Sequence, residues 1–201
     1  NVVVDMKSIM GEVLYDSEIA PYMGDWEGVE RSRDYDMLSY FIKYGTELDM
    51  RVFGSLNVFA GGHNFFDRGV IYGDKADWQS ICYEKGKLVP ISSIKTNYNG
   101  MMNPSIPEMQ DYQIAILKEF IQKYPEIDGL IFDRVRYDGI TSDFSDLSRK
   151  QFEEYAGVTV ENFPEDILSW YDEDGNLRDN WVPGKYGKKW IEWRASVIHD
   201  F

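Results

Sequence analysis

The chain of 201 residues is 43% hydrophobic and 28% charged, values typical of one folded domain and not of a disordered chain. Its 35 acidic and 21 basic residues give a formal net charge of -14, which repels phosphate groups and argues against nucleic acid as a partner. No apolar run approaches the ~20 residues of a membrane-spanning helix, so no membrane-spanning segment is expected.

The beginning of the chain alternates strand and helix patterns. Residues 2–5 are mostly β-branched and end at Asp5, which is typical of a strand buried on both faces with a polar residue at its carboxyl end. Apolar residues at helical spacing predict a helix over 34–48, and an apolar run predicts a second strand over 51–59. The order is therefore strand, helix, strand.

A long irregular segment follows over residues 60–104. It is rich in turn residues and includes a hairpin predicted over 83–91, with its turn at Lys85 and Gly86. Segments of this length without regular structure are usually functional, and in barrels they lie above the active site.

The strongest helix signal begins at Ser105. Ser105 and Glu108 form the pattern of a capping box and predict a helix over 107–124. Residues 128–135 then predict a third apolar strand, which Asp133 interrupts. The polar residues that follow Asp133 gather at the carboxyl end of this strand.

The last part of the chain is less regular. A capping pattern at Ser148 predicts a short helix that ends near Gly157. Asp174 and Gly175 predict a hairpin turn rather than a calcium loop, because the glycine that an EF-hand loop requires is absent. Apolar residues at helical spacing predict a final helix over 188–201.

Three buried strands that alternate with helices predict right-handed crossover connections, as in a (β/α) barrel or a doubly wound sheet. No glycine-rich phosphate-binding motif follows any strand, which removes the main sign of a nucleotide-binding fold. We therefore expect an α/β fold of the (β/α) TIM-barrel type, with 1–201 as a single domain and no cofactor. A full barrel takes eight strands and roughly 250 residues, so this chain would form a partial barrel whose open sheet edges favour self-association.

Asp133 is the best catalytic candidate. Burying a carboxylate within an apolar strand costs on the order of several kcal/mol unless the carboxylate is paired or faces a cleft. A glycosidase needs one carboxylate as nucleophile or base and a second carboxyl group as general acid. Neighbouring arginines favour the ionised form, which suits Asp133 to the first role. The alternative is an internal ion pair between Asp133 and Arg136.

Further polar residues near the predicted strand ends are candidates for binding substrate. Because parallel strands end on the same side, we expect Asp5, Asn57 and Asp133 to lie together at one edge of the sheet. Asp5 either contacts substrate, takes part in catalysis or caps the backbone, and Lys7 either binds sugar hydroxyls or pairs with Asp5. His63 binds sugar or makes ordinary loop hydrogen bonds, and because it lacks a second ligand no metal site is expected. The remaining candidates are Asn57, Asn103, Arg136, Tyr137 and Asp138. Three loop aromatics either stack on pyranose rings or simply pack: Trp26, Trp78 and Tyr98.

Four stretches resemble a bacterial family of glycosyl-hydrolase-like barrel proteins, described as family-ten-like or alpha-amylase-like glycosylhydrolases. These stretches are NVVVDMKSIMGEVLYDS, GSLNVFAGGHNFFDRG, MNPSIPEMQDYQIAILKEF and IDGLIFDRVRYDG. The last is the most specific, because a strand, an Asp and an Arg-Tyr pair occur together. In the related alpha-amylase pattern an arginine stands two residues before the nucleophilic Asp, whereas here that place is Ile131 and the arginines are Arg134 and Arg136.

The resemblance implies a (β/α) barrel with a carbohydrate substrate and a secreted, periplasmic or cell-envelope location. The three strands would be barrel strands two, three and four. The general acid would be Asp5 or Asp138, or would lie on a strand outside this chain. We expect a glycoside hydrolase that acts on a polysaccharide or oligosaccharide, and the alternative is a carbohydrate-binding barrel without catalysis.

Overall fold

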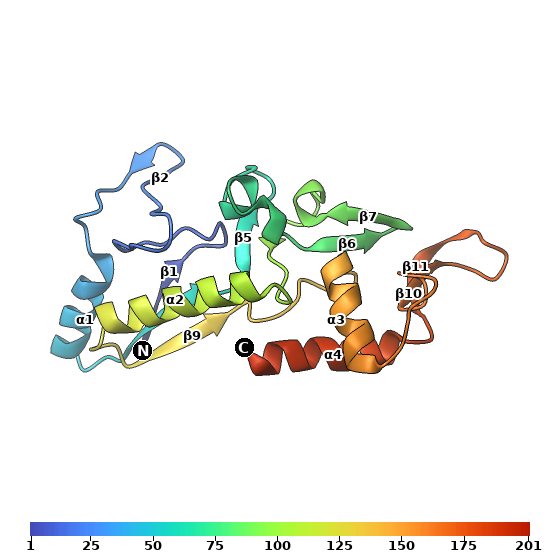
Figure 1. The fold of residues 1–201 in the computed structure, drawn as a ribbon. Helices are drawn as coiled ribbons and strands as arrows, with labels where there is room; N and C mark the ends of the chain where they lie inside the picture. Colours follow the sequence, from blue (N-terminus) through green and yellow to red (C-terminus); the bar gives the residue numbers. More distant parts are fainter.

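The computed structural model describes residues 1–201 as an elongated molecule with a parallel three-stranded sheet toward one end (Figure 1). The strands β1 (Val2–Lys7), β4 (Val52–Asn57) and β9 (Gly129–Asp133) lie in the order β1-β4-β9. Helix α1 (Met37–Glu47) connects β1 to β4, and helix α2 (Pro107–Lys123) precedes β9. The predicted alternation of strands and helices is confirmed.

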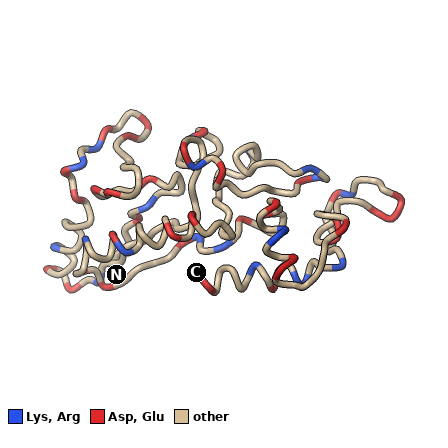
Figure 2. Tube along the Cα trace, in the orientation of Figure 1, with Lys and Arg blue, Asp and Glu red and all other residues tan.

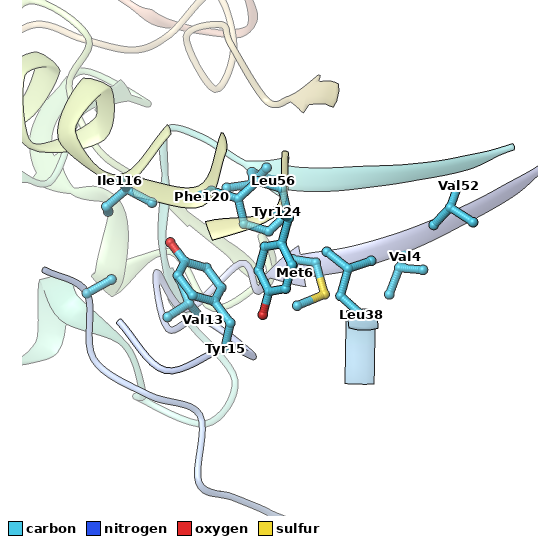
Figure 3. Close-up of a cluster of buried hydrophobic side chains, with 11 residues drawn as sticks. Val4, Met6, Val13, Tyr15, Leu38, Val52, Leu56, Ile116, Phe120 and Tyr124 are labelled. Atoms are coloured by element: carbon cyan, nitrogen blue, oxygen red, sulfur yellow. The ribbon is translucent and has the colours of Figure 1, made fainter. Parts of the chain in front are cut away.

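One face of this sheet is packed against both helices. Val4 of β1 and Leu56 of β4 share a buried apolar cluster with Leu38 of α1 and Phe120 of α2 (Figure 3). Gly54 lies beneath Phe120, where a Cβ atom would come 2.6 Å from the ring. The glycine therefore lets α2 approach β4 closely.

The opposite face of the sheet is open. Val3 on β1 is 55% exposed and Ile131 on β9 is 38% exposed. Strand pairing stops at β1 on one side and at β9 on the other. Only an isolated bridge from Lys7 to Val13 lies beyond β1, so most of both sheet edges is free. The structure therefore has the predicted parallel α/β sheet but forms open sheets and no closed barrel.

Antiparallel pairs follow in the segment that had no predicted regular structure apart from one hairpin. β5 (Ala60–His63) pairs with β8 (Asn99–Met101), and β6 (Ile81–Glu84) pairs with β7 (Lys87–Pro90). In Figure 1, β5 stands above the end of β9, and β6 and β7 lie to the right of that end. The predicted turn at Lys85 and Gly86 is confirmed, with φ of 47° and 77° as a type I′ turn requires. The other short elements are β2 (Asp25–Trp26), β3 (Val29–Glu30), η1 (Val70–Tyr72), η2 (Ala76–Trp78) and η3 (Ile91–Ser93).

The end of the chain forms a second packed region. Its elements are α3 (Asp146–Ala156), β10 (Leu168–Tyr171), β11 (Leu177–Pro183) and α4 (Gly187–Asp200). Trp190 of α4 stacks on Phe144 with ring centres 5.4 Å apart and meets Phe152 of α3 edge-on at 5.0 Å. The predicted final helix and the predicted hairpin turn between β10 and β11 are both confirmed.

Two predicted helix caps are wrong. Helix α2 begins after Ile106, and the Ser105 hydroxyl instead makes a 2.7 Å hydrogen bond with the Tyr137 hydroxyl. The cap of α3 is Ser145, whose hydroxyl accepts from the backbone N–H of Ser148. In both cases the hydroxyl that the local pattern assigned to a cap takes part in a long-range contact.

Charge is spread along the whole chain. Figure 2 shows acidic positions throughout the trace, with three in succession, Asp172 to Asp174, at the tip of the β10–β11 turn. None of the helices is long and apolar enough to cross a membrane. The expectation that nucleic acid is not a partner stays a prediction.

Candidate active site

The carboxyl ends of the three parallel strands bring Asp5, Asn57 and Asp133 together. Asn57 pairs with Asp133 in the register of β4 and β9. The Asn57 amide Nδ2 lies 3.2 Å from both carboxylate oxygens of Asp5 and donates to the Lys7 carbonyl at 2.7 Å. The expectation that these three side chains lie at one edge of the sheet is confirmed, and we call this group, with Arg134, the strand-end site.

Arg134 completes the strand-end site, although the sequence directed attention to Arg136. Its backbone N–H donates to Asp133 Oδ1 at 2.7 Å, and its Nε lies 3.9 Å from Asp133 Oδ2. The same Nε donates to Asn57 Oδ1 at 2.8 Å, and Nη2 donates to the Tyr98 hydroxyl at 3.2 Å. Arg134 therefore contacts Asp133, Asn57 and Tyr98 at the same time.

The alternative of an ion pair between Asp133 and Arg136 is wrong. The Arg136 guanidinium donates to the carbonyls of Tyr137 and Asp138 in its own loop. Arg134 adopts φ of 56°, in the left-handed region that a non-glycine residue seldom occupies. This conformation is a tertiary feature, so sequence spacing gave no signal that Arg134 rather than Arg136 would contact Asp133.

The electrostatics of the strand-end site distinguish its two carboxyl groups. Partial desolvation raises the pKa of Asp5, and the amide N–H of Asn57 opposes this rise. The nearby charge of Asp133 raises the pKa of Asp5 further, whereas Arg134 and Lys7 lower it. Asp133 itself is open to solvent, with 54% of its side chain exposed.

Lys7 is buried next to the strand-end site and binds the backbone that carries it. Its side chain is 1% exposed, and Nζ donates to the carbonyls of Asn57 at 2.7 Å and of Val58 and Ala60 at 3.1 Å each. A shift of register between Asp5 and Lys7 turns the lysine away from the open face. Burial lowers the pKa of Lys7 to about 7, and the charge of Asp5 opposes this. All three ammonium protons are used, so none is free for a sugar hydroxyl.

Other candidates lie in the framework of loops and have no contact with Asp133. Asn103 is 1% exposed and donates to Asp143 at 2.8 Å. Tyr137 is buried, and the Arg194 guanidinium lies 4.1 Å from its ring centre. Asp138 accepts a 2.7 Å hydrogen bond from the Asn97 amide. The structure therefore does not bring these three to the strand-end site.

The loop aromatics divide into two groups. Trp78 packs on Tyr112 with ring centres 5.3 Å apart, beside a buried apolar cluster. Trp26 and Tyr98 instead are both neighbours of the His63 ring, at 6.2 and 6.1 Å between ring centres. Tyr98 also carries the hydroxyl that Arg134 contacts, so this second group adjoins the strand-end site.

An apolar cavity of about 230 Å³ lies elsewhere, against α4. Its lining includes Phe144, Trp181, Trp190 and Ile191, and its one charged residue is Lys188. Such a lining has no carboxyl group for acid and base catalysis. In addition, no group of three or more His, Cys, Asp or Glu side chains is arranged to hold a metal ion. Of these two places, the strand-end site is the one that has the carboxyl groups needed for acid and base catalysis.

Comparison with known proteins identifies the family of the chain. The chain is 30% identical over 214 residues to an S-layer-related protein of Niallia circulans, and the match covers 100% of this chain but 13% of that protein. A family model described as glycosyl hydrolase-like 10 matches residues 1–201. The chain belongs to the glycosyl hydrolase-like 10 family.

Proposed function

We propose that this chain is a glycoside hydrolase domain in which Asp133 and Asp5 supply the two carboxyl groups. The observation that carries the proposal is that Asn57 links both carboxyl groups at the carboxyl edge of a parallel sheet. Its amide reaches Asp5 directly and reaches Asp133 through Arg134. Catalytic groups of (β/α) enzymes hang from this edge. Membership in a glycosyl-hydrolase-like family supports the same proposal.

The two carboxyl groups have different environments, as acid and base catalysis requires. Asp133 lies beside the Arg134 cation and is exposed, which suits a nucleophile or base that works as a carboxylate. Asp5 has a raised pKa, which suits a general acid that must carry a proton to the leaving oxygen. A neutral sugar placed above Asn57 would meet one group on each side.

We further propose that the sheet is part of a (β/α) barrel, with β1, β4 and β9 near barrel strands two to four. The sheet face with Val3 and Ile131 would then line the interior of the barrel, and the face that packs against Phe120 of α2 would be the outer one. This chain spans 13% of the length of the relative it matches. The name of that relative, an S-layer-related protein, supports a cell-envelope or secreted location.

The test is hydrolysis of a panel of neutral polysaccharides by the wild type and by Asp133→Asn. We expect turnover to fall by about a hundred-fold or more, which is typical for loss of one acid or base group, with an unchanged melting temperature. Asp111→Asn, on the exposed side of α2, is the matched control and should keep full turnover. Equal turnover by Asp133→Asn and the wild type would contradict the proposal.

A second function is favoured by one observation. Arg134 already donates to Asn57 and contacts Asp133, so part of the polar capacity of the site is satisfied before substrate arrives. Such a site suits a non-catalytic carbohydrate-binding domain. The same panel decides between the two, because a binding domain retains oligosaccharides and releases no reducing sugar.

A further inference from the structure

Five ring side chains gather beside the strand-end site. His63 lies at their centre, with Phe66 at 4.6 Å, Phe65 at 5.6 Å, Tyr98 at 6.1 Å and Trp26 at 6.2 Å between ring centres. Trp26 also meets Phe66 edge-on at 5.2 Å. They come from three separate segments of the chain, and we call the group the aromatic surface.

The backbone holds the aromatic surface in place. His63 pairs with Asn99 across β5 and β8, and the neighbouring Asn64 N–H donates to the Tyr98 carbonyl at 2.8 Å. His63 N–H donates to the Arg68 carbonyl at 2.7 Å, which closes the turn that presents the two phenylalanines. The aromatic surface is thus built on paired strands rather than on a free loop.

Arg68 ties the remaining ring into the same unit. Its guanidinium binds both oxygens of Glu12, at 2.9 and 3.1 Å, and Asp25 at 3.0 Å. It also lies 5.8 Å from the ring centre of Trp26. A bidentate pair of this type fixes geometry as well as charge, so Trp26 is held against His63.

Three of the rings remain largely open to water. Phe65 is 58% exposed, Phe66 is 53% exposed and Tyr98 is 44% exposed. Two successive exposed phenylalanines contribute little to the core, and contiguous exposed apolar rings usually mark a binding surface. The surface continues into the strand-end site, because Arg134 donates to the Tyr98 hydroxyl and lies 5.9 Å from the centre of its ring.

We propose that the aromatic surface is a sugar-binding subsite for a neutral pyranose unit of the chain whose bond the strand-end site cleaves. This inference rests on the proposed function. A pyranose ring offers apolar C–H faces and polar edges, which match exposed aromatic rings beside a guanidinium and a hydroxyl. The net charge of -14 disfavours an acidic polysaccharide, so the subsite takes uncharged sugars.

Binding is measured by titration calorimetry with four neutral hexaoses: cellohexaose, xylohexaose, maltohexaose and chitohexaose. Asp133→Asn serves as the parent protein, because it prevents turnover during the titration. We expect at least one hexaose to bind, and Phe66→Ala or Tyr98→Ala in this parent to weaken its binding about ten-fold or more. Tyr155→Ala, which removes a 47% exposed ring on α3, is the matched control and should not change the affinity.

The outcomes separate the subsite from the catalytic proposal. Failure of all four hexaoses to bind, or equal affinity of the Phe66→Ala and parent proteins, overturns the subsite whatever the turnover results. Weakened binding together with equal turnover by wild type and Asp133→Asn keeps the subsite and removes the catalytic role of Asp133. A change of oligomeric state in Phe66→Ala without a change of affinity would assign the surface to contacts between copies and would also overturn the proposal.

Discussion

Asn57 joins the two carboxyl sides of the strand-end site through one amide group. Its Nδ2 donates toward Asp5, and its Oδ1 accepts from Arg134, which in turn contacts Asp133. An amide is suited to this place because it offers a donor to one neighbour and an acceptor to the other. Asn57 is therefore a positioning residue, and Lys7 fixes its backbone carbonyl from below.

Replacing Asn57 should change the pH profile of hydrolysis. The Asn57 amide lowers the pKa of Asp5, so Asn57→Ala removes that influence and the pKa of Asp5 rises further. If protonated Asp5 is the general acid, activity falls as pH rises through the pKa of Asp5, and the alkaline limb of kcat/KM should move to higher pH. Asn176→Ala, in the β10–β11 turn, is the control, and an unshifted limb in Asn57→Ala would refute the coupling.

Lys7→Met should destabilise the fold. The change leaves three buried carbonyls without a donor, and it also removes a buried charge. As the net effect, we expect the free energy of unfolding to fall by about 2–4 kcal/mol. The difference in stability between the wild type and Lys7→Met also depends on pH. The pKa of Lys7 is lowered to about 7 in the folded state, below its value of ~10.4 in the unfolded chain. The unfolded state therefore binds more protons between about pH 7 and 10, and the stability of the wild type should rise across this range relative to Lys7→Met.

Urea unfolding at pH 7 and pH 9 measures both effects. Lys118→Met, on the exposed side of α2, is the matched control and should change the free energy of unfolding by less than about 0.5 kcal/mol. A Lys7→Met protein as stable as the wild type would show that the three carbonyl contacts contribute nothing to the fold.

At the scale of elements, apolar periodicity predicted the three parallel strands and the helices between them. It also predicted that Asp5, Asn57 and Asp133 share an edge, because parallel strands end on the same side. Contacts between distant segments were not predictable: the Ser105 hydroxyl bonds Tyr137 instead of capping α2. The side chain of Arg134 was also missed, since its contact depends on a left-handed backbone that no local pattern encodes.

The close approach of α2 to β4 can be tested at Gly54. A Cβ there would lie 2.6 Å from the Phe120 ring, so Gly54→Ala must displace the ring or the helix. We expect a loss of about 1–3 kcal/mol of stability, as for other overpacked cores. Gly139→Ala is the matched control, because a Cβ atom at that position would have no neighbour within 4 Å. Equal melting temperatures for the two variants would contradict this account of the packing.

At the scale of the whole molecule, the parallel sheet has a free edge at β9, an edge at β1 that carries only the bridge to Val13, and one open face. Phe132 on the edge strand β9 is 53% exposed on the side where α2 packs, and Val3 on β1 is 55% exposed on the other side. Free edges and exposed apolar side chains favour pairing with another sheet. The 201-residue chain should therefore self-associate in solution.

Sedimentation velocity over a range of concentrations tests this expectation. Phe132→Lys places a charge on the free edge and should shift the chain toward monomer. Ile121→Lys replaces a residue that is 48% exposed on α2 and should leave the distribution unchanged. A wild-type chain that stays monomeric at all concentrations would show that the open sheet needs no cover.

The central claim is that Asp133 and Asp5 act as a base or nucleophile and a general acid. It is tested most directly by the turnover of Asp5→Asn and Asp133→Asn on a polysaccharide and on an aryl glycoside with a good leaving group. A good leaving group needs little protonation, so Asp5→Asn should be impaired by about a hundred-fold on the polysaccharide and far less on the aryl glycoside. Asp133→Asn should be impaired on both. Wild-type turnover by both variants on both substrates would contradict the account.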